Sequence, residues 1–253
     1  MRRLIHSSLA LSTLTFLILW SGWTTSVSAI SNAQNLDCAL AGTPTANQSS
    51  NGAEASPAAE GSSQAALSDA TTVELEHGNA LLWGNGERSL LLLHGAVYDA
   101  ASWDAQAQWL AGQGFTVLAL EELAPDAVQD GLAYLMSCGA SGVTVIGASA
   151  GGSAALTFLA GDPEGITGLI LLSATGDVIN LGEYSKLFVA SEAEGMEERL
   201  VSMANDAPGS QNQTLILPGS AHAQAIFTTD QSEPLLNAIN AFLEESVDWN
   251  SQA

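Results

Sequence analysis

The chain has 253 residues and carries 27 Asp and Glu against 5 Lys and Arg, which gives a formal net charge of −22 at pH 7. A negative field of this size disfavours nucleic acid and anionic membrane surfaces as partners. The acidic excess favours solubility, but it does not indicate a reaction.

The first 29 residues are typical of a secretory signal peptide. Arg2 and Arg3 give a positive start, residues 9–20 are mostly apolar, and Val-Ser-Ala at 27–29 forms a small-residue cleavage site. The apolar stretch is shorter than the ~20 residues that a bilayer-spanning helix needs. We therefore expect export to the periplasm or the extracellular space, with no stable membrane insertion after cleavage. An uncleaved signal anchor is the alternative.

Residues 30–69 are rich in Ala, Ser, Gln, Asn and Gly and contain almost no large apolar side chains, which predicts a flexible low-complexity linker. Residues 70–253 then form one domain that is long enough for a substantial core. Cys38 lies in the linker and Cys138 in the domain; a disulfide between them and two separate thiols both remain open. Neither cysteine has the neighbours of a zinc ligand, and no metal site is predicted.

From residue 71 onward short apolar runs alternate with helical patterns, which predicts an α/β domain with a mostly parallel sheet and helices on both faces. Residues 72–76 and 80–83 are predicted to form a hairpin at the sheet edge. Further strands are predicted at 89–93, 115–120, 143–146, 166–172, 187–190 and 214–217. Ser102 is predicted to cap a helix that ends near Gly112. Further helices are predicted at 126–136, 149–159 and 234–242.

A serine stands at the turn between the strand at 143–146 and the helix that follows it. The sequence there is Gly-Ala-Ser-Ala-Gly-Gly at 147–152, a G-x-S-x-G pattern centred on Ser149. Such a turn holds the serine in a strained conformation that exposes its hydroxyl, and larger side chains two residues away would collide with neighbouring elements. A glycine-rich turn with an incidental serine is the alternative. The strand before it and the helix after it favour a nucleophile.

A serine hydroxyl is a poor nucleophile without a base. The chain has four histidines: His6, His77, His94 and His222. His6 belongs to the signal peptide, His77 to a turn, and His94 directly follows a buried strand, where its ring is expected to brace the next loop. His222 is the only histidine after Ser149. It lies in a loop just past the last predicted strand and is the predicted general base.

From about residue 74 onward the chain resembles small α/β-hydrolases of the carboxylesterase and dienelactone-hydrolase-like group. Three motifs carry the resemblance and occur in the expected order: Leu-Leu-His-Gly-Ala at 92–96, Gly-Ala-Ser-Ala-Gly-Gly at 147–152, and Leu-Pro-Gly-Ser-Ala-His at 217–222. The resemblance implies an α/β-hydrolase fold, in which the triad order along the chain is nucleophile, acid, histidine.

The resemblance also implies an oxyanion hole made from two backbone N–H groups. One belongs to Ala150, directly after the nucleophile, and the other to Ala96, in the loop after His94. Such donors stabilise the negative oxygen that develops when a serine attacks a carbonyl, and one donor contributes ~3–4 kcal/mol.

The triad acid of such hydrolases usually follows the strand that we predict at 187–190. Glu194 aligns with the position where the family usually has Asp, and it is the first choice. Asp177, after the preceding strand, and Glu192 are the alternatives, in that order. The acid holds the histidine in the correct tautomer and stabilises its protonated form.

The chain departs from the family at two places. Glu121 and Glu122 follow the strand at 115–120, where many relatives carry an Asp-x-Arg-Gly turn, so another contact must brace that corner. Only residues 175–186 separate two of the later strands, which is too short for a helical cap. We therefore expect no large cap domain and an open site.

Together these observations predict an exported serine hydrolase that cleaves a small-molecule carboxylic ester through an acyl-enzyme on Ser149, with His222 as general base and no cofactor or metal. Hydrolysis of another acyl bond, such as a thioester, lactone or amide, is one alternative. A catalytically inactive α/β-hydrolase-like binding domain is the other. Inactive relatives usually lose the nucleophile or the histidine, whereas this chain keeps both.

Overall fold

The computed structural model describes residues 70–250. The signal peptide predicted at 1–29, the linker predicted at 30–69 and Cys38 lie outside the described residues. Cys138, the other cysteine, is disulfide-bonded. Within the described part of the chain, no helix is both long and apolar enough to cross a bilayer.

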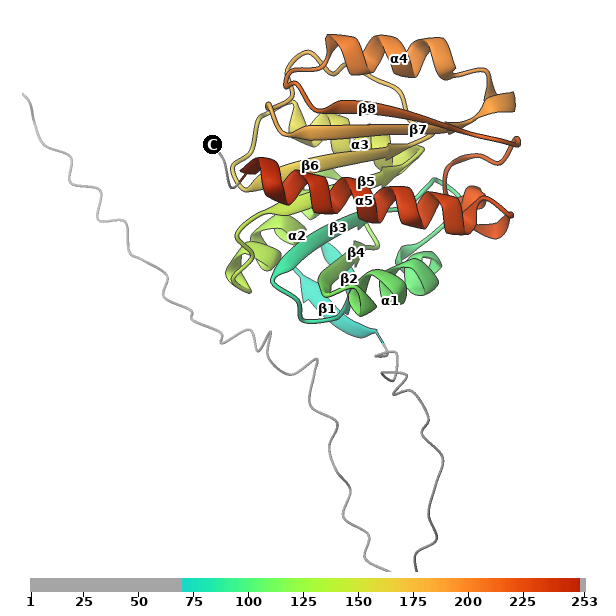
Figure 1. Cartoon of the computed structure of the whole chain (residues 1–253). Coiled ribbons are helices and arrows are strands. Elements are labelled where there is room, and N and C mark those ends of the chain that lie inside the picture. The colour runs from blue at the N-terminus through green and yellow to red at the C-terminus, as the bar shows by residue number, and fades with distance from the viewer. Residues whose placement is uncertain (1–69, 251–253) are drawn as a thin grey trace, which may run out of the picture. The chain divides into compact units, whose positions relative to one another are not determined.

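An eight-stranded sheet forms the centre of the domain, in the order β1-β2-β4-β3-β5-β6-β7-β8 (Figure 1). β1 and β2 form an antiparallel hairpin at one edge, β2 is antiparallel to β4, and every later neighbouring pair is parallel. The prediction of a mostly parallel α/β sheet is therefore confirmed. The strands are β1 (Thr71–Leu75), β2 (Gly78–Trp83), β3 (Arg88–Leu93), β4 (Phe115–Leu120), β5 (Val143–Ala148), β6 (Ile166–Leu172), β7 (Ser185–Ser191) and β8 (Asn212–Leu217).

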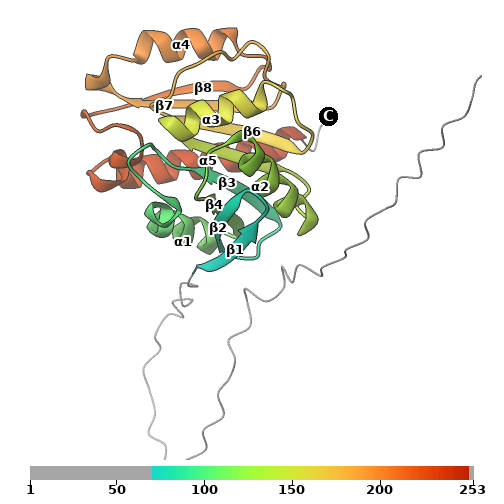
Figure 2. The same ribbon diagram turned by 180° about the vertical axis from the view of Figure 1, so that it is seen from behind.

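Helices cover both faces of this sheet, as the two opposite views show (Figures 1 and 2). α1 (Asp104–Gly112) and α5 (Ser232–Asn250) pack on one face, where their apolar side chains share a core with the strands. α2 (Pro125–Ser137), α3 (Ala150–Leu159) and α4 (Glu197–Asp206) pack on the other face and form a second core layer. Because the central strands are buried on both sides, they read in sequence as continuous apolar runs.

Two helical elements differ from the prediction. Ser102 does not cap α1, because a 3-10 turn, η2 (Ala100–Trp103), precedes this helix. Asp99 caps the 3-10 turn by accepting the N–H of Ser102 at 2.8 Å. α4 was not predicted, because its sequence is mostly charged or polar. Only Leu200 and Met203 of α4 are buried, one helical turn apart on the face that meets the sheet.

The connection from β6 to β7 contains no helix. Residues 173–184 run between these two parallel strands as irregular backbone. A crossover between parallel strands usually contains a helix, and many relatives add a cap here. The expectation that the described chain has no large cap is confirmed.

Candidate functional site

Ser149 occupies the sharp turn between β5 and α3, at the carboxyl end of the central strands. Its backbone angles are φ 49° and ψ −109°, a region that residues with a Cβ rarely adopt. Its N–H donates to the carbonyl of Leu172, at the end of neighbouring β6, at 2.9 Å. The adjacent strand therefore holds the strained turn in place.

The glycines around Ser149 are required by close approaches of the backbone. A Cβ at Gly151 would lie 2.2 Å from the carbonyl oxygen of Leu93, and a Cβ at Gly147 would lie 2.6 Å from the Cα of Gly152. Both distances are shorter than any tolerated contact with a fixed backbone atom. The turn therefore admits no side chain at these two positions.

His222 follows β8 and lies directly beside Ser149. Its Nε2 is 2.8 Å from the Oγ of Ser149, which is hydrogen-bonding distance. The imidazole side chain is 56% exposed. The ring is therefore open to solvent, and Ser149 beside it is half-buried.

Glu194 lies on the far side of the His222 ring, in the 3-10 turn η3 (Glu192–Glu194) after β7. Its Oε1 is 2.6 Å from Nδ1 of His222, and its side chain is only 8% exposed. Asp177 and Glu192 are exposed, and the carboxylate of Asp177 accepts the N–H of Ile179 instead. The structure thus brings Glu194, and neither alternative acid, into contact with His222.

Two serines that no sequence motif marks hold the carboxylate of Glu194. The hydroxyl of Ser173 and the N–H of Ser191 both donate to Oε2, at 2.8 and 2.7 Å. The hydroxyl of Ser173 also accepts the N–H of Ala223, at 2.8 Å. Ser173 therefore connects Glu194 to the loop that carries His222. The only sequence signal was a polar residue directly after a buried strand.

Ala96 and Ala150 follow two neighbouring parallel strands, β3 and β5, at equivalent positions along the chain. Leu93 of β3 pairs with Gly147 of β5 in parallel register, and each alanine is three residues further along its chain. Ala150 is the first residue of α3, where N–H groups have no partner within the helix. The N–H of Gly95 is already occupied, which leaves Ala96 as the next donor in that loop.

His94 and Glu121 brace the loop that contains Ala96. Nδ1 of His94 is 2.8 Å from the carbonyl of Gly95, and Nε2 is 3.0 Å from the carbonyl of Glu121. The carboxylate of Glu121 accepts the N–H of Ala100 at 3.0 Å. The glutamate that stands where relatives have an Asp-x-Arg-Gly turn thus holds this corner through both its backbone and its side chain.

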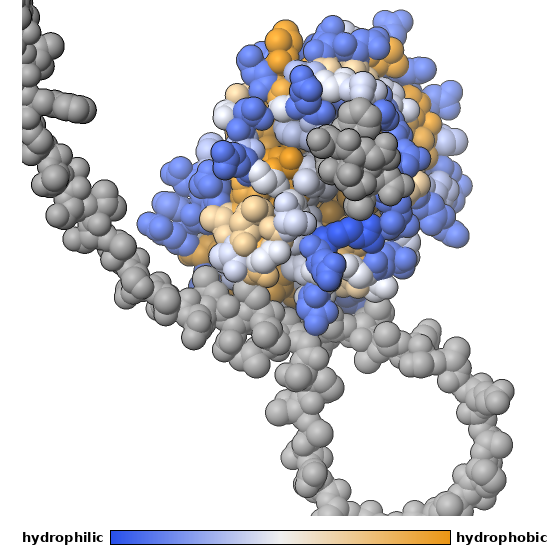
Figure 3. All heavy atoms as spheres, turned by 60° about the vertical axis from the view of Figure 1, so that its left-hand side comes forward, coloured by the Kyte–Doolittle hydropathy of each residue, from blue (hydrophilic) through white to orange (hydrophobic). Residues whose placement is uncertain are grey.

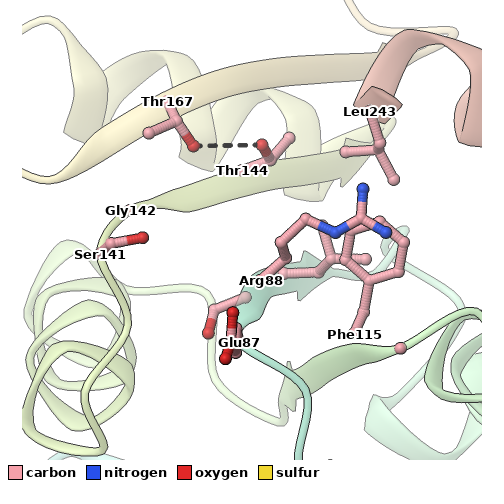
Figure 4. A pocket seen from close by; sticks show the side chains of 11 residues that line it. Glu87, Arg88, Phe115, Ser141, Gly142, Thr144, Thr167 and Leu243 are labelled. Carbon is pink, nitrogen blue, oxygen red and sulfur yellow. Dashed lines mark hydrogen bonds between the residues drawn. The ribbon is translucent and has the colours of Figure 1, made fainter. Parts of the chain in front are cut away.

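A cavity of about 650 Å³ opens at the opposite, amino end of the strands. Arg88 points into it; its guanidinium lies 4.0 Å from the ring centre of Phe115 and donates to Glu244 at 2.8 Å (Figure 4). None of the predicted site residues lines this cavity. On the face that Figure 3 turns forward, hydrophobic residues occur in several separate patches among hydrophilic ones.

Three potential metal ligands gather away from Ser149. Glu76, His77 and Asp130 each place one ligand atom within 4.8 Å of the others. Nδ1 of His77 is 2.9 Å from a carboxylate oxygen of Asp130, and this hydrogen bond raises the pKa of His77 above its ordinary value. The contact joins the β1–β2 turn to α2 and is an ion pair when His77 is protonated.

Comparison with solved structures identifies the fold. The chain is similar to a predicted CIB-like hydrolase from Thermoplasma acidophilum (17% identity, TM-score 0.57, 70% of this chain and 98% of that one). It is also similar to an esterase from Pyrococcus furiosus (13%, 0.56, 70% and 91%) and to a hormone-sensitive lipase from a metagenome library (18%, 0.55, 75% and 88%). No family model and no curated protein matches the sequence. At these identities the likeness establishes an α/β-hydrolase fold.

Proposed function

Because the described chain has an α/β-hydrolase fold, we propose that it is a serine hydrolase that cleaves carboxylic esters through an acyl-enzyme on Ser149. One observation carries the proposal: Ser149, His222 and Glu194 form a continuous hydrogen-bonded series, with distances of 2.8 and 2.6 Å. In such a series the base removes the serine proton while the acid orients and stabilises the base.

The proposed reaction begins when Oγ of Ser149 attacks the ester carbonyl and Nε2 of His222 takes the hydroxyl proton. The N–H groups of Ala96 and Ala150 stabilise the negative oxygen of the tetrahedral intermediate. His222 then gives the proton to the departing alcohol, which leaves the acyl group on Ser149. Water, deprotonated by His222, attacks the acyl-enzyme, and the collapse of the second intermediate releases the carboxylic acid and restores the serine.

The exposed ring of His222 and the absence of a cap in the described chain favour a soluble substrate that reaches the site without a lid opening. The same residues would also serve for a thioester, lactone or amide, because the triad sets the chemistry and the pocket sets the substrate.

We propose in addition that residues 1–29 direct export. N-terminal sequencing of the protein recovered outside the cytoplasm tests this, and a start at Met1 would contradict it.

Hydrolysis of short-chain p-nitrophenyl esters by the purified protein tests the proposed activity. Ser149→Ala and His222→Ala should each abolish turnover, and Ser149→Ala should also abolish labelling by a fluorophosphonate probe. Ser202→Ala and His77→Ala are matched controls on exposed side chains and should remain active. No labelling of the wild type, together with no turnover of esters, thioesters, lactones or amides, would favour the inactive binding domain.

A further inference from the structure

Gln224 lies two residues after His222, and its side chain is almost completely buried, with 5% of the residue exposed. Its carboxamide spans the loop after β3. Oε1 accepts the N–H of Gly95 at 2.7 Å, and Nε2 donates to the hydroxyl of Ser102 at 2.8 Å. A single side chain from the histidine loop therefore holds both ends of the segment that contains Ala96.

Further hydrogen bonds within the segment from Gly95 to Ser102 accompany this bridge. The hydroxyl of Ser102 donates to the carbonyl of Asp99, whose carboxylate accepts the N–H of Ser102. The N–H of Tyr98 donates to the carbonyl of Gly95. Gln224 thus joins the beginning of the loop to its end.

The chain segment 222–224 contacts three parts of the proposed machinery in succession. His222 contacts Ser149, the N–H of Ala223 contacts Ser173, and Gln224 contacts Gly95. Ala223 has a positive φ of 51°, which turns the two flanking side chains in different directions. The positions of the base and of the Ala96 N–H are therefore set by one short stretch of backbone.

From this geometry we infer that Gln224 is a positioning residue, which fixes the Ala96 N–H relative to Ser149 and His222. The inference rests on the proposed hydrolase function. A donor must lie at hydrogen-bond distance from the oxygen of the intermediate, and a displacement of about 1 Å costs about 10²-fold in rate. Gln224 touches neither the substrate nor the reacting atoms in this scheme.

Gln224→Met tests the inference, because methionine keeps the length and removes both amide contacts. We expect kcat to fall by about 10- to 100-fold while KM changes by less than about twofold. The inhibition constant of a trifluoromethyl ketone, whose hemiketal oxygen occupies the oxyanion position, should rise by the same factor. Gln213→Met, the same change on the exposed face of β8, is the matched control and should leave both values unchanged.

Ser102→Ala removes the hydroxyl that accepts from Gln224 and donates to the carbonyl of Asp99, and it should reduce kcat by a smaller factor. In the double variant the two losses should not add, because both changes break the same bridge. If Gln224→Met does not fold, an unchanged kcat and inhibition constant in Ser102→Ala alone would overturn the inference. Unchanged kcat and inhibition constants in both single variants, or fully additive losses, would overturn the inference. An inactive wild type that no fluorophosphonate labels would instead overturn the proposed function.

Discussion

Oε1 of Glu194 lies 2.6 Å from Nδ1 of His222, while Oε2 of the same carboxylate accepts two hydrogen bonds from other groups. In a Glu194→Gln variant the amide oxygen must therefore take the Oε2 position, because donors already point at it. The amide NH₂ then faces Nδ1 and leaves the histidine proton on Nε2, where the ring cannot accept the proton of Ser149. We expect kcat to fall by about 10³- to 10⁴-fold.

Steady-state kinetics on two further variants complete this test. Glu192→Gln and Asp177→Asn change exposed carboxylates that do not contact His222, and both should stay within about twofold of the wild type. A loss confined to Asp177→Asn would show that the acid comes from the segment after β6.

The grouping of Ser149, His222 and Glu194 could be predicted from the sequence because each residue follows a parallel strand, and the carboxyl ends of such strands meet at one edge of the sheet. The same rule admits Asp177 and Glu192, so the choice of Glu194 rested on the resemblance to α/β-hydrolases. The contacts of Gln224 and Ser173 that hold this site could not be predicted from the sequence. Gln224 meets Gly95 across 129 residues, and Ser173 meets Glu194 through a hydroxyl that no motif marks.

The fold could be predicted where burial leaves a pattern in the sequence. Strands covered on both faces appear as apolar runs. By contrast, α4 buries only two side chains, so its mostly charged and polar sequence gives little sign of a buried face. Ser102 is a good capping residue by type, but a 3-10 turn capped by Asp99 precedes α1, and α1 begins at Asp104 without a side-chain cap.

Ser173→Ala should weaken both stability and turnover. The change removes a donor to the Glu194 carboxylate and leaves the buried N–H of Ala223 without an acceptor. We expect the free energy of unfolding to fall by about 1–3 kcal/mol, measured by urea denaturation, and kcat to fall by about tenfold. Ser202→Ala, on the exposed face of α4, is the matched control. Equal stability of the two variants would show that the Ser173 contacts contribute little.

Gly151→Ala should prevent the native turn from forming. The added Cβ would lie 2.2 Å from the carbonyl oxygen of Leu93 in the central sheet, and neither backbone can move without disturbing β3 or α3. We expect a loss of more than about 3 kcal/mol in unfolding free energy. Gly112→Ala is the matched control, because nothing lies within 4 Å of its added Cβ at the end of α1. That variant should be as stable as the wild type or up to about 1 kcal/mol more stable. Similar denaturation midpoints for the two variants would contradict the assignment of Gly151.

His77 gives the domain a pH-dependent contact far from Ser149. Its Nδ1 and its backbone N–H both lie within 2.9 Å of one oxygen of Asp130, which joins the β1–β2 turn to α2. The hydrogen bond and the charge of Asp130 raise the pKa of His77 above 6.5 in the folded protein. The folded state then binds this proton more tightly than the unfolded state does, so the contribution to stability is complete below about pH 6.5 and is lost as the pH rises through the raised value.

The comparison of wild type with Asp130→Asn isolates this contribution, since other titrating groups act on both proteins alike. The difference between their urea midpoints should be larger at about pH 6 than at about pH 9. It should shrink in 1 M salt, because the His77 and Asp130 side chains are 46% and 19% exposed. In a His77→Gln background the same substitution should give a difference that does not change with pH. A wild-type difference that is equal at both pH values would show that the neutral hydrogen bonds, and not the ion pair, hold this turn on α2.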